Sequence, residues 1–210
     1  MKQGDGVNNK TVLAIGAHPD DIEIGCGGTI KKHVLKGDNV YYLIATNGEK
    51  GGDPHIRMDE ARRAATLMGV NDIEFLELKD AFILHDGATV ALIDDAIRKY
   101  CPSIVYVHSL KDYHQDHHNI ARAVLSASRK MQNSIMCYEA PSTTLEFIPT
   151  AFSNVTDTFE MKIKCINEFH SQEEKDYVER EAVVNLCKFR GKTINAEYAE
   201  AFEVVRLLEW

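Results

Sequence analysis

The fold is decided by the stretch from Thr11 to Lys36, which reads TVLAIGAHPDDIEIGCGGTIKKHVLK. Its first six residues, TVLAIG, form a short continuous apolar run that ends in glycine, a pattern typical of a strand buried in a parallel sheet. Beyond the polar residues and the glycine pair at 27–28, the apolar residues Ile30, Val34 and Leu35 recur at helical spacing. The stretch therefore predicts a strand, a polar turn and a helix, which together begin a βαβ unit.

The same alternation continues along the chain. Strands are predicted at 39–46, 73–78 and 103–108, and helices at 56–68, 88–100 and 119–131. The weaker pattern after residue 135 predicts strands at 134–139 and 154–158 and helices at 159–169 and 177–187. This order predicts an α/β, Rossmann-like three-layer fold with a mostly parallel central sheet. We expect residues 1–210 to form a single domain, with a flexible lead at 1–10.

The composition excludes several classes of protein. The 24 basic and 32 acidic side chains give a net charge of -8, which argues against nucleic acid as a partner. No apolar run reaches the ~18 to 20 residues that span a bilayer, and the polar start lacks the apolar centre of a secretory signal. The five cysteines are scattered and form no C-x-x-C pair, so no disulfide framework is indicated. We expect a cytoplasmic protein without a membrane span.

Two of the predicted strands run directly into clusters of ionisable residues. The first strand is followed by AHPDDIE at 17–23, and the fourth leads into HSLKDYHQDHH at 108–118. Because the carboxyl ends of parallel strands open at the same crevice, the two clusters can face each other. Three histidines and two aspartates between Asp112 and His118 are hard to explain as an exposed polar face. The sequence therefore places the candidate site at this edge of the sheet.

The donor atoms in these clusters suit a catalytic zinc ion. Zinc accepts imidazole nitrogen and carboxylate oxygen, and catalytic sites use three protein ligands with one position left for water. His18, Asp21 and one histidine of the second cluster supply that set. Two alternatives stay open: either aspartate at 20–21 can cap the helix that begins near Ile22, and such sites also accept iron, cobalt or manganese.

The remaining groups predict hydrolysis of an amide. Asp20 can take the proton of a water molecule that attacks the carbonyl carbon. His114, as an imidazolium, can stabilise the oxyanion and then protonate the departing amine, with Asp116 holding its ring charged and oriented. The predicted reaction is zinc-assisted amide hydrolysis.

The motifs AHPDD, IEIGCGGT and HQDH resemble the PIG-L or LmbE-like deacetylases. Further matches are TNGE at 46–49, RMDEA at 57–61, HSQ at 170–172 and YAEAF at 198–202. That family includes zinc-dependent hydrolases of N-acetylglucosamine conjugates, so the resemblance implies the removal of an N-acetyl group from such a small-molecule sugar conjugate. It also implies a homo-oligomer, a trimer or a hexamer.

Carried over by position, the resemblance implies His18, Asp21 and His117 as zinc ligands. It implies Asp20 as the general base and His114, paired with Asp116, as the oxyanion-stabilising group. His117 is thereby preferred over His118, which we expect to face outward from a helix. Gln115 departs from the proline that many members carry.

The expected substrate-binding residues are Glu49, Arg57 and His170. The alternative for Arg57 is a surface ion pair with Asp59 or Glu60, and the alternative for His170 is a structural hydrogen bond. Two rival functions stay open: an amidase of the same mechanism that cuts another small N-acyl or amide conjugate, and a non-catalytic domain that binds a metal or a sugar. The spare carboxylate of Asp20 favours catalysis, because a site that only binds metal does not need it.

Overall fold

The structure, a computed structural model, describes residues 9–208, except for the side chains of 173–179. The expected lead at 1–10 lies mostly outside this range. A seven-stranded sheet has the order β3-β2-β1-β4-β5-β7-β6. Its parallel strands are β1 (Thr11–Gly16), β2 (Asn39–Thr46), β3 (Asp72–Leu78), β4 (Ile104–His108) and β5 (Ser134–Tyr138), and the strands β6 (Ala151–Asn154) and β7 (Ala199–Arg206) continue it in antiparallel pairing.

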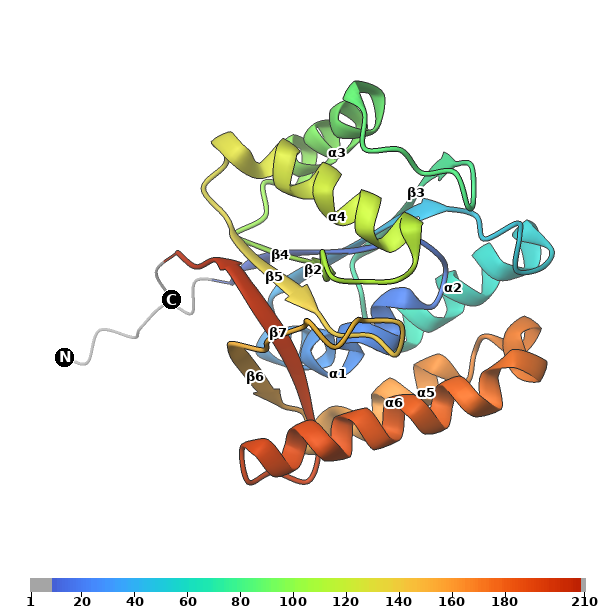
Figure 1. Cartoon of the computed structure of the whole chain (residues 1–210), viewed down its shortest axis with the longest axis vertical. Helices are drawn as coiled ribbons and strands as arrows, with labels where there is room; N and C mark the ends of the chain where they lie inside the picture. Colours follow the sequence, from blue (N-terminus) through green and yellow to red (C-terminus); the bar gives the residue numbers. More distant parts are fainter. Residues whose placement is uncertain (1–8, 209–210) are drawn as a thin grey trace.

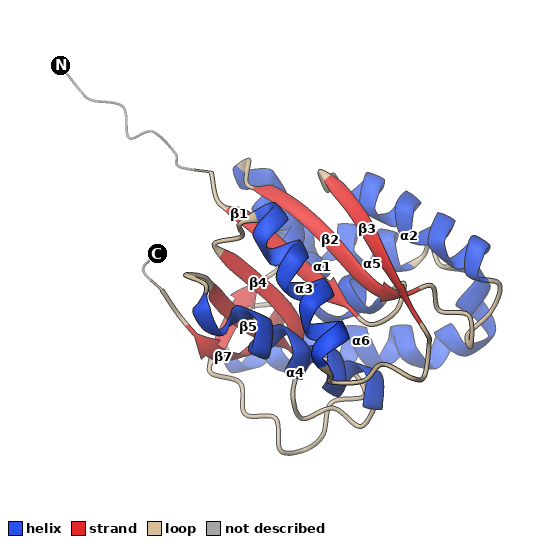
Figure 2. Ribbon diagram, turned by 90° about the horizontal axis from the view of Figure 1, so that it is seen from above, coloured by secondary structure: helices blue, strands red, loops and turns tan. Residues whose placement is uncertain are grey.

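Helices cover both faces of the sheet, as Figures 1 and 2 show. One face carries α3 (Gly87–Tyr100) and α4 (Gln115–Ala127), and the other carries α1 (Asp21–Lys36), α2 (Pro54–Met68), α5 (Phe159–Ile166) and α6 (Glu173–Thr193). Two apolar cores match these layers. In one, Ile22 and Ile30 of α1 pack with Met68 of α2, and in the other Ile93 of α3 packs with Ile120 of α4. The predicted α/β fold with three layers and a mostly parallel sheet is confirmed.

Several predicted bounds were wrong, and one strand was missed. The helix predicted at 159–169 ends at Ile166, and the one predicted at 177–187 spans Glu173–Thr193. Helix α4 begins at Gln115 rather than at 119, because His114 caps it by accepting the N–H of Asp116 on its ring. The expected strand at 154–158 ends at Asn154, and a short 3-10 turn, Thr156–Thr158, follows it. The strand β7 was not predicted at all, although it lies between β5 and β6 and buries Phe202.

No described helix combines the length and the apolar character that a bilayer crossing needs.

Candidate functional site

A cavity of about 350 Å³ opens at the carboxyl ends of β1 and β4 and brings the two predicted clusters together. Its lining includes Asp20, Asp21 and His18 from the first cluster and His114 and His117 from the second. These side chains come from the turn between β1 and α1 and from the start of α4. The two clusters therefore converge at one edge of the sheet, as the argument from parallel strands predicted.

Three side chains of this cavity, those of His18, Asp21 and His117, bring donor atoms close to one another. Nδ1 of His18 lies 3.3 Å from Nε2 of His117 and 3.4 Å from Oδ2 of Asp21. Nε2 of His117 lies 3.3 Å from Oδ1 of Asp21. Two ring nitrogens that face each other over a carboxylate need a positive charge between them, either a proton or a metal cation. The donor set therefore fits a zinc ion.

The second nitrogen of His117 is held by an aspartate that the sequence reading left without a role. Nδ1 of His117 lies 3.2 Å from Oδ2 of Asp112, whose side chain is fully buried. Asp112 also accepts the Oγ–H of Ser142 and the backbone N–H of His114. The carboxylate therefore fixes the imidazole with Nε2 toward the cavity, as partners of metal-ligating histidines do.

His18 is oriented in the same way by two carboxylates. Its Nε2 lies 3.2 Å from Oδ1 of Asp80 and 3.4 Å from Oδ2 of Asp116, which leaves Nδ1 for the cavity. Burial alone would raise the pKa of Asp80, but the bonds from His18 and from the N–H of Lys50 lower it to about 2. Sequence reasoning missed Asp80, although it follows the third parallel strand and so lies at the same edge of the sheet.

Asp21 is anchored on the side away from the cavity. Its Oδ2 accepts the backbone N–H of His18 and lies 3.0 Å from Nε2 of His108. Burial, and then the charge of His117, lowers the pKa of His108 to about 4, so this histidine is neutral. His108 is fully buried at the end of β4 and stacks on His117. These contacts leave Oδ1 of Asp21 as the free ligand atom.

Other combinations of donors also lie close together at this site. Donor atoms also lie within 4.8 Å of one another in three groups: His18 with His114 and His117, Asp21 with His108 and His117, and His18 with Asp80 and Asp116. In the last two groups Asp80, Asp116 and His108 already support His18 and Asp21 from outside. We therefore prefer His18, Asp21 and His117, whose remaining donor atoms all have other partners.

Asp20 and Arg57 form one unit beside these ligands. Asp20 adopts a left-handed backbone conformation with φ of 104°, which is strained for a residue other than glycine. One guanidinium nitrogen of Arg57 donates to Oδ2 of Asp20 at 3.0 Å and to the carbonyl of Pro19 at 2.7 Å. The other donates to the carbonyl of Gly48. Arg57 is buried, so the expected alternative of a surface pair with Asp59 or Glu60 was wrong.

His114 lines the cavity from the first position before α4. Its Nδ1 accepts the backbone N–H of Asp116 at 3.2 Å, so the hydrogen-bond network assigns the ring proton to Nε2. Burial, followed by the charges of His117 and His18, lowers the pKa of His114. The expected imidazolium is therefore replaced by a neutral ring with one N–H donor.

The carboxylate of Asp116 does not have the expected place beside the ring of His114. It accepts the N–H groups of Ala81 and Ile83 at 2.7 and 3.1 Å and contacts His18. The reason is local geometry. The backbone N–H of Asp116 donates to His114, whereas the buried side chain of Asp116 points to the loop after β3. Asp116 therefore positions His18 rather than His114.

The expected substrate-binding residues Glu49 and His170 lie outside the described lining of the cavity. Both are exposed, and Glu49 accepts the backbone N–H of Asp80. The neighbour of His170, Gln172, lines the cavity instead and donates to the carbonyl of Gly51.

His118 faces another side of α4. Its ring contacts the carbonyl of Leu110 at 2.7 Å, so it points away from the three candidate ligands.

Comparisons with known proteins identify similar sequences and structures. The profile of the PIG-L family, described as GlcNAc-PI de-N-acetylase, matches residues 13–128. The uncharacterized deacetylase YaiS of Escherichia coli is 34% identical over 77% of this chain and 91% of its own. A crystal structure of N,N'-diacetylchitobiose deacetylase from Pyrococcus horikoshii is 25% identical, with a TM-score of 0.84 over 94% of this chain and 84% of its own.

One relative has a different activity. The 4-oxalmesaconate hydratase of Pseudomonas putida is 29% identical over 51% of this chain and 47% of its own. The matched part of the family profile spans β1 to α4 and so includes both histidine clusters. On the strength of that match and of the agreement with YaiS over most of both chains, this protein belongs to the PIG-L family.

Proposed function

We propose that this chain is a zinc-dependent N-deacetylase that removes the acetyl group from an N-acetylglucosamine derivative through attack by water. The observation that carries the proposal is that the carboxylate of Asp20 lines the same cavity in which His18, Asp21 and His117 bring their donor atoms together. Family membership supports the hydrolysis of an acetamide, and the deacetylases YaiS and diacetylchitobiose deacetylase support the sugar class.

His18, Asp21 and His117 would hold the zinc ion, which supplies a Lewis acid that polarises the acetyl carbonyl and lowers the pKa of water. Asp112, Asp80, Asp116 and His108 hold these three residues in place from outside. Such partners fix the free ring nitrogen of each histidine toward the ion and raise its basicity.

In this proposal Asp20 is the base. Its carboxylate accepts a proton as water attacks the carbonyl carbon, and it returns this proton to the nitrogen of the sugar as the C–N bond breaks. Arg57 keeps the carboxylate in one orientation through the contact to Oδ2. Acetate and a free amine are the products.

His114 is proposed to stabilise the oxyanion. A neutral ring with its proton on Nε2 can donate one hydrogen bond to the negative oxygen that develops on the carbonyl. Because the donor is already fixed by the capping bond to Asp116, little reorganisation is needed during the reaction.

For sugar binding we propose Arg57, Glu49 and His170. Arg57 lines the cavity. Glu49 directly precedes Lys50, and His170 lies two residues before Gln172; Lys50 and Gln172 both line the cavity. Ser171 donates to Glu60 through its N–H and its hydroxyl, which ties the segment 170–172 to α2.

The decisive experiment measures primary amine released from a panel of N-acetylglucosamine conjugates by the zinc-loaded protein, with a chelated sample as control. We expect chelator-sensitive release from some conjugates, with acetate formed in equal amount. If no conjugate of the panel releases amine, although elemental analysis confirms bound zinc, the proposal would be overturned. That result would favour another amide substrate, a non-catalytic domain or the hydration chemistry of the Pseudomonas putida relative.

The proposal treats residues 1–210 as a single catalytic domain that assembles as a trimer or a hexamer in the cytoplasm. Light scattering on the purified chain measures the assembly, and cell fractionation measures the location.

A further inference from the structure

A second cavity, of about 280 Å³, lies between the later half of α1 and the strands β4, β5, β6 and β7. It shares no described lining residue with the candidate active site. Its floor is apolar, because Tyr106, Met136 and Phe202 contribute side chains that are buried in the sheet. Such a hollow can receive the apolar body of a small molecule.

The polar part of the lining is basic. Lys32, His33 and Lys36 line the cavity, and none of its described lining residues is Asp or Glu, although the protein carries a net charge of -8. Lys32 and Lys36 are four residues apart on α1, a spacing at which like charges repel. Burial, followed by the charge of Lys36, lowers the pKa of Lys32. An anion placed between the two ammonium groups would relieve this repulsion.

Three carboxylates outside the lining act on its basic groups: Asp38 opposes the lowering of the pKa of His33, and Glu200 and Asp157 oppose the lowering of the pKa of Lys32. Asp38 accepts from the backbone N–H of Lys10 and pairs with Nδ1 of His33 at 2.7 Å. Glu200 accepts the N–H groups of Gly28 and Thr29 and pairs with Lys162. Lys32 itself donates only to neutral oxygens, the Oγ of Ser153 and the carbonyl of Asn154.

A buried hydroxyl provides an independent observation. Thr29 lines the cavity and is 6% exposed, and its Oγ1 has no hydrogen-bond partner among the described residues. Buried hydroxyl groups are nearly always hydrogen-bonded, and one left without a partner destabilises the protein. An acceptor oxygen of a ligand in this cavity would satisfy Thr29.

We propose that this cavity binds a small organic anion with an apolar body, of the size of an aromatic carboxylate, and that Lys32, Lys36 and Thr29 contact the anionic group. The volume of the cavity equals about nine water molecules at their ~30 Å³ share of the liquid. Benzoate, with about nine non-hydrogen atoms, is therefore a suitable probe. A ligand of this size is expected to bind with a Kd of about 1 mM.

The test titrates benzoate into the zinc-loaded full-length protein and follows backbone amide shifts by NMR. We expect saturable shifts at 29–36 and 151–154, and weaker binding of benzamide, which has the same shape without the charge. Lys36→Glu reverses an exposed charge at the cavity and should lower the affinity for benzoate by about fivefold or more. Ala151→Leu should also lower the affinity for benzoate, because the larger side chain fills part of the cavity.

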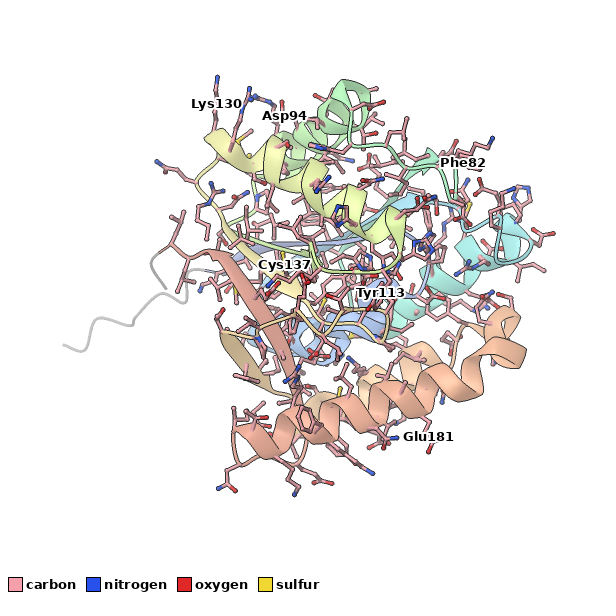
Figure 3. All side chains as sticks on the ribbon, in the orientation of Figure 1. Phe82, Asp94, Tyr113, Lys130, Cys137 and Glu181 are labelled. Carbon is pink, nitrogen blue, oxygen red and sulfur yellow. The ribbon has the colours of Figure 1, made fainter. Side chains whose placement is uncertain are left out.

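The matched control is Lys130→Glu. Lys130 points into solvent beyond the end of α4, on the other face of the sheet from α1 (Figure 3). This variant should bind benzoate as the wild type does. Saturable shifts confined to the candidate active site, no saturation at all, or equal effects of Lys36→Glu and Lys130→Glu would each overturn the proposal. If Ala151→Leu does not fold, the benzoate affinities of Lys36→Glu and Lys130→Glu still test the proposal.

Discussion

Each candidate zinc ligand presents one atom to a common point and has its other polar atom held by a partner. His117 is held by Asp112, His18 by Asp80 and Asp116, and Asp21 by the backbone N–H of His18 and by His108. These contacts fix the rings before any ion binds, so little side-chain entropy remains to be lost on binding. The order at the site therefore depends on side chains outside the candidate ligand set: Asp112, Asp80, Asp116 and His108.

The base is tested by Asp20→Asn. The amide keeps the shape of the side chain but cannot accept a proton, so zinc content should stay near one per chain while kcat falls by about 10²- to 10⁴-fold. Elemental analysis and amine release measure the two quantities on the same sample. Arg57→Lys is the companion variant, because it removes the paired contacts to Asp20 and Pro19 but leaves the carboxylate. Asp20→Asn with wild-type kcat would remove Asp20 from the base role.

The outer contact to His117 is tested by Asp112→Ala. Without its acceptor the ring is no longer held with Nε2 toward the cavity, so zinc affinity should fall by about 10- to 100-fold. Competition with a chromogenic chelator measures this affinity. Ser142→Ala is the companion variant: it removes a hydroxyl that donates to Asp112 and lies 3.4 Å from Nδ1 of His117, but it leaves the carboxylate in place, so the loss of affinity should be smaller. Unchanged affinity in Asp112→Ala would show that Asp112 does not support the ligand.

The sequence predicted which clusters line the cavity, but it did not predict the hydrogen-bond partners of their side chains. The clusters that contain His18, Asp21 and His117 were expected to converge, and they do, because parallel strands carry their following residues to one edge. The partners of these side chains depend on rotamers and on a loop after β3. Asp80 was missed because it stands alone in its segment, with no histidine beside it to indicate a site. The different place of Asp116 has the same origin, since spacing alone does not determine which neighbour a carboxylate meets.

At the scale of elements, α1 is interrupted at Cys26, whose φ of -142° is not helical. The backbone groups released there are taken up by a buried ion pair. Glu200 of β7 accepts the N–H groups of Gly28 and Thr29, and Lys162 of α5 donates to the carbonyl of Ile24. The glycines let the helix approach closely: a Cβ at position 25 would lie 2.2 Å from the ring of Tyr138. The ion pair thus joins α1, α5 and β7.

Lys162→Met tests this junction. It leaves the carboxylate of Glu200 buried without a cation, which should lower the free energy of unfolding by about 3 kcal/mol or more. Adding Glu200→Gln should recover part of the loss, because the uncompensated charge is then removed. Urea unfolding measures both variants. Lys164→Met, which removes an exposed partner of Glu160, is the control and should leave stability nearly unchanged. A wild-type stability for Lys162→Met would contradict the structural role of the pair.

Elements made from local patterns were predicted, and those made by distant pairing were not. The first four strands and their helices follow continuous apolar runs and helical periodicity in the chain. In contrast, β7 pairs with β5 across about sixty residues and carries the charged residues Glu200 and Glu203 within its length. Its alternation is therefore weak, and only the tertiary contacts of Glu200 explain why an acid is buried there.

For the molecule as a whole, the two cavities lie at different parts of the same helix. The turn before α1 carries His18 and Asp20 into the candidate active site, whereas Lys32 and Lys36 near its end border the second cavity. The junction of Glu200 and Lys162 lies between them and fixes the interruption at Cys26. A ligand in the second cavity would therefore contact the same helix, α1, that follows Asp20.

Acid should destabilise the whole fold through His33, which is buried at that second cavity. Burial lowers its pKa below 6.5, with Lys36 and Lys10 adding to the effect and Asp38 opposing it, while the hydroxyl of Tyr106 contacts its Nε2. The unfolded chain then binds more protons than the folded one below pH 6.5, so the free energy of unfolding falls as the pH falls toward the folded-state pKa. His33→Gln should make this slope shallower by at most about 1.4 kcal/mol per pH unit. Urea unfolding between about pH 5 and 6.5 measures the difference, with the exposed His85→Gln as control. If both variants and the wild type give the same slope, His33 is not a source of the acid sensitivity.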